Sequence, residues 1–185
     1  MRNSIILMTM AAVIITTACS INVKKDEQGQ DKNVDINTPF GGIHVNENAD
    51  VRDTGLPVYA GARLKKKDDS GDEKSANVNI STGEFGLKVV AVEYESDETP
   101  NKLIAYYKNA LKKYGTVLEC HTEGQHDTYE GDSDALKCEG NNNGKTIELK
   151  VGTKSNEHLV SIKPQGKGSD FALVYVRTRG KDTTI

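Results

Sequence analysis

Two cysteines in the second half of this 185-residue chain are the clearest chemical signal in its sequence. Cys120 and Cys138 have 17 residues between them, and each lies near the end of a segment with strand character. In an oxidising compartment two such thiols favour a disulfide. Closing a loop of this size would stabilise the domain by about 3 kcal/mol. We therefore expect a Cys120–Cys138 disulfide if the chain is exported.

A metal site is the alternative interpretation of the same region. Cys120, His121, His126 and Cys138 offer the sulfur and nitrogen ligands that zinc or copper accepts. The set lacks a close pair such as C-x-x-C. Neighbouring residues on a strand point to opposite faces, so Cys120 and His121 would converge only at a bulge. The disulfide is favoured, and we expect no metal and no cofactor.

Catalytic motifs are not found in the sequence. The acidic residues Glu130, Asp132 and Asp134 form a cluster, but without the spacing of a calcium-binding EF-hand. There is no G-x-S-x-G elbow, no H-E-x-x-H and no phosphate-binding glycine loop. An active site built from distant residues would leave no local trace, so an envelope hydrolase stays the least favoured alternative.

The amino terminus has the pattern of an export signal. Arg2 precedes a run of 11 residues at 5–15 that are apolar except for Thr9, and small residues at 16–18 lead to Cys19. This run is too short for a bilayer core, which needs about 20 apolar residues. It has the length of the hydrophobic region of a secretory signal peptide. We expect residues 1–18 to be removed, and an ordinary signal peptide with an incidental cysteine remains the alternative.

This segment resembles the lipobox of bacterial lipoproteins. The resemblance implies a diacylglycerol group on Cys19, which becomes the new amino terminus after cleavage. The chain departs from the usual pattern at Thr16, where such signals have Leu. Ser20 replaces the Asp that signals inner-membrane retention, so the resemblance favours the outer membrane if the cell has two. Two or more acyl chains anchor a protein stably where one binds only marginally.

The composition of the chain describes a water-soluble body. The mean hydropathy is −0.57 and the formal net charge is −3. Basic and acidic residues alternate without forming a basic patch, so the chain has no general electrostatic attraction for nucleic acid or for anionic lipid. We expect no nucleic-acid partner.

The best-defined element is an amphipathic helix over residues 100–114. Thr99 can cap its start, and Pro100 occupies the first turn, where its missing N–H group costs nothing. Apolar residues recur at spacings of three and four through the segment, and Gly115 supplies the stop. Strand patterns precede and follow the helix, at residues 87–94, 116–121, 135–139, 145–152, 158–163 and 171–177. Short polar turns between the later strands favour antiparallel neighbours. We therefore predict an α+β fold, in which one long helix packs on an antiparallel sheet.

The region before this domain is expected to hold a tether and a hairpin. Residues 20–33 are polar and lack periodicity, which indicates a flexible tether. Val34, Ile36, Ile43 and Val45 alternate with polar residues around a Pro-Phe-Gly-Gly turn, which predicts a short hairpin. The expected organisation of the chain is a signal at 1–18, lipidated cysteine and tether at 19–33, hairpin and turn segment at 34–64, charged loop at 65–75, α+β domain at 76–179 and polar tail at 180–185.

Two stretches carry a second resemblance. TPFGGIHV at 38–45 and GLPVYAGA at 55–62 are similar to a pattern in small exported bacterial proteins of uncharacterised function. Ala60 stands where that pattern has Pro. The resemblance implies a strand, a helix and a further run of strands, and it brings no activity and no functional residue.

Together these features predict a lipid-anchored protein of the cell envelope that acts as a non-enzymatic binding or structural module. The partners expected are the membrane, through the lipid, and an envelope protein that contacts one sheet face or the loop at 122–134. A small-molecule or metal-binding lipoprotein is the alternative.

Overall fold

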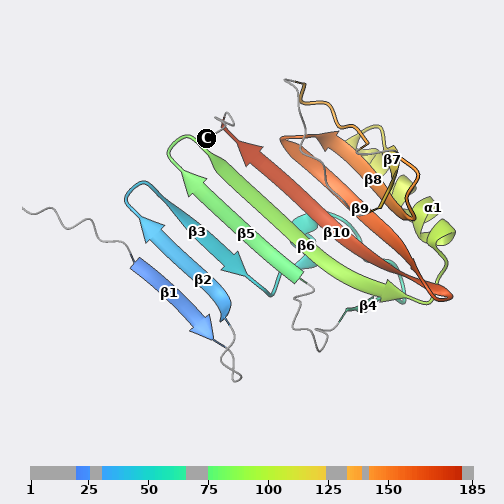
Figure 1. Cartoon of the computed structure of the whole chain (residues 1–185), viewed down its shortest axis with the longest axis horizontal. Coiled ribbons are helices and arrows are strands. Elements are labelled where there is room, and N and C mark those ends of the chain that lie inside the picture. Colours follow the sequence, from blue (N-terminus) through green and yellow to red (C-terminus); the bar gives the residue numbers. More distant parts are fainter. Residues whose placement is uncertain (1–19, 26–30, 66–74, 124–132, 139–141, 181–185) are drawn as a thin grey trace, which may run out of the picture.

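A computed structural model of the chain describes residues 20–25, 31–65, 75–123, 133–138 and 142–180. Figure 1 shows strands assembled into one long sheet with a helix near one end. The strands and helices are β1 (Ser20–Lys25), β2 (Asp31–Thr38), β3 (Gly41–Asn46), η1 (Val51–Thr54), β4 (Arg63–Leu64), β5 (Ser75–Thr82), β6 (Gly86–Ser96), α1 (Pro100–Leu111), η2 (Lys112–Tyr114), β7 (Leu118–Thr122), β8 (Thr146–Thr153), β9 (Asn156–Gln165) and β10 (Gly168–Arg179).

The sheet has ten strands in the order β1-β2-β3-β5-β6-β10-β9-β8-β7, with β4 paired to β6 outside this path. All the pairings are antiparallel. The chain therefore builds two meanders, β1 to β6 and β7 to β10. They join where the last strand, β10, pairs with β6 (Figure 1).

The hydrophobic core lies on one face of the second meander. Apolar side chains alternate along β6, β8, β9 and β10 and meet α1, which contacts β8 and β9. Leu103, Tyr107 and Leu111 of α1 are 0% exposed, because the three- and four-residue spacing puts them on one side of the helix. Leu56, from the segment after η1, completes this cluster. We call this side of the sheet the α1 face.

The α+β class predicted from the sequence agrees with the structure, but the helix is shorter and covers less of the sheet. α1 ends at Leu111, and the residues to Tyr114 tighten into the 3-10 turn η2 before Gly115, whose φ is +139°. Thr99 has extended backbone angles but makes no capping bond through its side chain. The sheet dominates the fold.

The prediction of a tether at 20–33 was wrong where the structure describes that region. Residues 20–25 form β1 and residues 31–38 form β2, and the two strands pair with Ile21 opposite Ile36 and Val23 opposite Val34. Both pairs place two apolar side chains against each other, and cross-strand contacts of this kind stabilise a sheet. The expected hairpin of β2 and β3 is present, as the inner part of a larger sheet.

A strand was expected at residues 135–139, and the described part of it, residues 135–138, makes a single bridge, between Ala135 and Thr153. The charged loop at 65–75 and the polar tail at 180–185 fall mostly outside the described residues.

Candidate functional site

The register of the first meander aligns apolar residues into two rows on the side of the sheet opposite the α1 face. We call this surface the apolar face. Its rows run directly across neighbouring strands, because each residue pairs with its counterpart on the next strand. One row is Ile21, Ile36, Ile43, Ile80 and Leu87, and the other is Val23, Val34, Val45, Val78, Val89 and Val176.

The apolar face is open to solvent at three of its row members, and its other row members are half-buried. Ile21 is 66% exposed, Val23 39% and Ile43 37%, whereas Leu173 in the core is 0% exposed. Within the described residues the helical elements α1 and η1 contact β6, β8, β9 and β10 from the α1 face. Six neighbouring strands carry the rows, so the face extends about 24 Å across the sheet at about 4.8 Å per strand. Together the two rows cover an area of a few hundred Å², the size of patch that marks an interaction site.

The opposite side of the strands β1, β2, β3 and β5 is polar. It forms a shallow concavity of about 420 Å³, and His44 lies in it with its Nδ1 2.7 Å from the Asp35 carboxylate. The other polar side chains of this surface are Lys24, Asn33, Asn46, Asn77 and Asn79. The strands β1, β2, β3 and β5 therefore form an amphipathic layer, apolar on one side and polar on the other.

The turn between β2 and β3 presents one aromatic side chain to solvent. Phe40 is 80% exposed, the largest exposure among the large apolar residues in the described part of the chain. Gly41 follows it with φ of +152°, and a Cβ there would lie 1.9 Å from the carbonyl oxygen of Ser81. Only glycine permits this approach to β5. Gly41, the first glycine of the TPFGG stretch, is therefore required for β3 to begin this close to β5.

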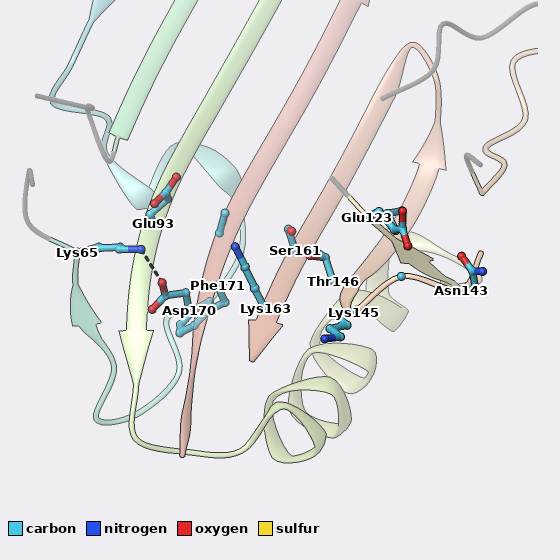
Figure 2. Close-up of a pocket in the computed structure, with 13 residues that line it drawn as sticks. Lys65, Glu93, Glu123, Asn143, Lys145, Thr146, Ser161, Lys163, Asp170 and Phe171 are labelled. Atoms are coloured by element: carbon cyan, nitrogen blue, oxygen red, sulfur yellow. Dashed lines mark hydrogen bonds and ion pairs between the residues drawn. The ribbon is translucent and has the colours of Figure 1, made fainter. Parts of the chain in front are cut away.

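A larger cavity of about 600 Å³ is lined by residues of β6, β7, β8, β9 and β10 and by Lys65, the residue after β4. In Figure 2 Lys65 and Asp170 face each other at 2.5 Å, and Lys163 lies close to them. The remaining side chains that line it are mostly polar, among them Glu93, Ser161, Thr146, Thr122 and Glu123. This site could hold a small polar molecule.

The structure joins Cys120 and Cys138 in a disulfide with an S–S distance of 2.03 Å. Both thiols are consumed, so they cannot serve as thiolate metal ligands. Cys120 is 0% exposed beside Glu148, on the side of the sheet opposite α1. His121 is on the α1 side and pairs with Glu119, whose carboxylate also contacts Lys108. The Lys108 ammonium lowers the pKa of Glu119, and His121 adds to this effect.

The remaining residue of the candidate metal site, His126, falls outside the described residues, and so does Cys19, the expected lipidation site. In the part of the chain that the structure describes, no three acidic, histidine or cysteine side chains are grouped as metal ligands. Of the acidic cluster Asp134 is described, and it accepts hydrogen bonds from the Ser155 hydroxyl and N–H groups at 2.9 and 3.0 Å. These bonds lower the pKa of Asp134, chiefly the one from the hydroxyl.

The sequence analysis did not identify β1, which carries the first member of each row, Ile21 and Val23. Ile21 and Val23 alternate with Asn22 and Lys24 in the same way as the apolar residues of the next strands. The alternation spans four residues beside charged ones, so it was assigned to a tether. The comparable stretches NVDIN and NVNIS, each a polar residue between two apolar ones, are the signal that could have placed β1 in the sheet.

No family model, curated protein or solved structure matches this chain. None of the helices in the described parts of the chain combines the length and apolar character needed to cross a bilayer.

Proposed function

We propose that this protein is a lipid-anchored, non-enzymatic module of the cell envelope that binds through its apolar face. The observation that carries the proposal is the double row of aliphatic side chains, one row across five strands and the other across six, on which no helix of the described residues packs. Water-exposed apolar surface of this extent is unfavourable unless something covers it, since each Å² removed from water stabilises by about 25 cal/mol. The anchor rests on the leader sequence and on Cys19.

Binding fits this surface better than catalysis does. The two rows consist of aliphatic side chains, which can neither transfer a proton nor act as nucleophiles. Their contribution to a complex is apolar area, and strand backbone at the β1 edge can add hydrogen bonds.

A second candidate function is the binding of a small polar molecule in the 600 Å³ cavity. Its support is the group formed by Lys65, Lys163 and Asp170, with Ser161 next to Lys163 on β9 (Figure 2). A ligand with both charged and hydroxyl groups would suit these donors and acceptors. The metal-binding version of this alternative loses two of its four ligands to the disulfide.

The anchor and the surface can be tested separately in cells. Labelled palmitate should appear on the parent protein and not on Cys19→Ala, and the variant should leave the membrane fraction. Unlabelled parent protein would refute the anchor. A photo-crosslinking residue at Ile80, on the apolar face, should form adducts, whereas the same residue at Asn79, on the polar side, should not. Equal yields at the two positions would refute binding through the apolar face.

A further inference from the structure

We infer that the surface covered by the apolar face is the lipid bilayer itself, so that the module lies flat on the membrane to which it is anchored. This inference rests on the proposed lipid at Cys19 and names the partner of the proposed binding surface.

The first step of the argument is the distance between the anchor and the sheet. β1 begins at Ser20, the residue directly after Cys19. Adjacent Cα atoms are about 3.8 Å apart, so no spacer separates the lipidated residue from the strand. Ile21, the first member of its row and 66% exposed, follows one position later. A diacylglycerol in the bilayer therefore holds the edge of the apolar face at the depth of the headgroups.

The second step concerns Phe40, whose turn lies at the same end of the strands as Ser20. Ser20 pairs with Asn37, and the turn that carries Phe40 follows Thr38. An aromatic ring that is 80% exposed beside an acylated residue is placed to enter the interface between headgroups and acyl chains. The lipid, Phe40 and Ile21 then give the sheet three contacts with the bilayer near the same end of its strands.

The third step is the amphipathic character of the layer. The two apolar rows contain no charged residue, and the opposite side of the same strands carries Asp35, His44 and Lys24. A layer with this division suits a boundary between hydrocarbon and water, where interfacial elements bury their apolar side about 5–10 Å deep. The net charge of −3 does not draw the protein to anionic lipid, so the contact must be apolar.

A second copy of the chain is the competing occupant, because two apolar sheet faces can pack about 10 Å apart. The position of the anchor favours the bilayer. A lipid attached one residue before β1 draws Ile21 and its neighbours toward the membrane, whereas a face-to-face dimer needs them turned toward the partner copy.

The absence of Trp from the sequence makes a direct test possible. The mature lipidated protein would carry a single probe, Ile43→Trp on the apolar face or His44→Trp on the polar side, as matched neighbours on β3. Each variant would be reconstituted in phosphatidylcholine–phosphatidylglycerol vesicles with and without brominated acyl chains. Bromine should quench the probe at position 43 about twofold or more and leave the probe at 44 unchanged, as expected for burial about 5–10 Å deep. The pair Ile80→Trp and Asn79→Trp on β5 repeats the test if the β3 variants do not fold.

The outcomes separate this inference from the proposed function. Vesicle-bound protein whose position-43 probe is as exposed and unquenched as the probe at 44 would overturn the bilayer contact and leave the anchor intact. A blue-shifted but unquenched probe with a crosslinked dimer would assign the face to a second copy, which also overturns it. Protein that lacks acyl chains by mass and stays free of vesicles would defeat the anchor and this inference together.

Discussion

Glu148 and Lys150 form an ion pair in which Nζ lies 3.1 Å from Oε2, and each side chain is only 3% exposed. They lie on β8, on the same side of the sheet as the apolar face. The hydroxyl of Thr122 donates to the other carboxylate oxygen of Glu148 at 3.3 Å. The disulfide of Cys120 and the bridge between Ala135 and Thr153 attach residues 133–138 beside this pair, at the end of the sheet far from β1.

Removing one partner of this buried pair should destabilise the protein strongly. In Lys150→Met the buried Glu148 side chain loses its cation, and broken buried pairs cost about 3–5 kcal/mol. Urea unfolding would measure the change in the free energy of unfolding. The double variant Glu148→Leu with Lys150→Met should recover most of the loss, since it leaves no charge buried. A double variant as unstable as the single one would contradict this account.

The disulfide should contribute to stability through the loop that it closes. The double variant Cys120→Ala with Cys138→Ala should lower the free energy of unfolding by about 2–4 kcal/mol. Adding reductant to the parent protein should lower it by a similar amount, and adding it to the double variant should change nothing. Thiol reagents should label the unfolded parent chain after reduction and not before. Labelling without reduction would show that the thiols are free.

The hydroxyl of Tyr107 should be required for the packing of the segment after η1. Tyr107 is 0% exposed, and its oxygen accepts a hydrogen bond from the Tyr59 N–H group at 3.1 Å. Burial raises the pKa of Tyr107, so the phenol stays protonated. Tyr107→Phe leaves that N–H group without its acceptor, which should cost about 1–3 kcal/mol in urea unfolding. Tyr106→Phe is the matched control at 36% exposure and should change stability by less than about 0.5 kcal/mol. Equal losses in the two variants would count against the hydrogen bond.

The stability of the protein should fall in mild acid because of His158. Its ring stacks on the ring of Tyr114 with 3.7 Å between the ring centroids, and its Nδ1 lies 2.9 Å from the Thr54 carbonyl oxygen. Burial lowers the pKa of His158, the Thr54 carbonyl opposes this, and Lys113 adds to the lowering. The unfolded chain therefore binds the proton more readily than the folded one.

The sign of the pH effect follows from that difference. The contribution of neutral His158 is complete above the unfolded pKa of about 6.5 and is lost as the pH falls below it. Urea unfolding of the parent at about pH 7.5 and about pH 5.5 should show the decrease. His158→Gln should show a smaller difference between the two pH values, whatever its own stability. An unchanged difference would assign the acid sensitivity to other groups.

The sequence predicted the helix and most strands because their signals are local. Pro100, the apolar stripe and Gly115 mark the helix, and its early end at Leu111 reflects the tightening of the last turn into η2. The alternation in β2, β3 and β5 predicted strands with one apolar side. It did not show whether another element covers that side, because cover depends on where α1 packs.

The sheet order and the cavity could not be predicted in the same way. β6 pairs with β10 through contacts such as Tyr94 with Phe171, which are far apart in the sequence. The residues that line the 600 Å³ cavity come from β6, β7, β8, β9, β10 and the loops beside them, and they share no motif. The disulfide was predictable because only two cysteines follow Cys19 in the sequence, and they can form a single pair.

The central position of β10 has a consequence for how the protein reaches its folded state. The strand that joins the two meanders ends at Arg179, so the long sheet cannot close until nearly the whole chain is free to fold. Until then β6 and β9 each present an unpaired edge, and the core of Leu173 and Phe171 is unfilled. Completion of the sheet therefore depends on contacts between residues far apart in the sequence, which form more slowly than local ones.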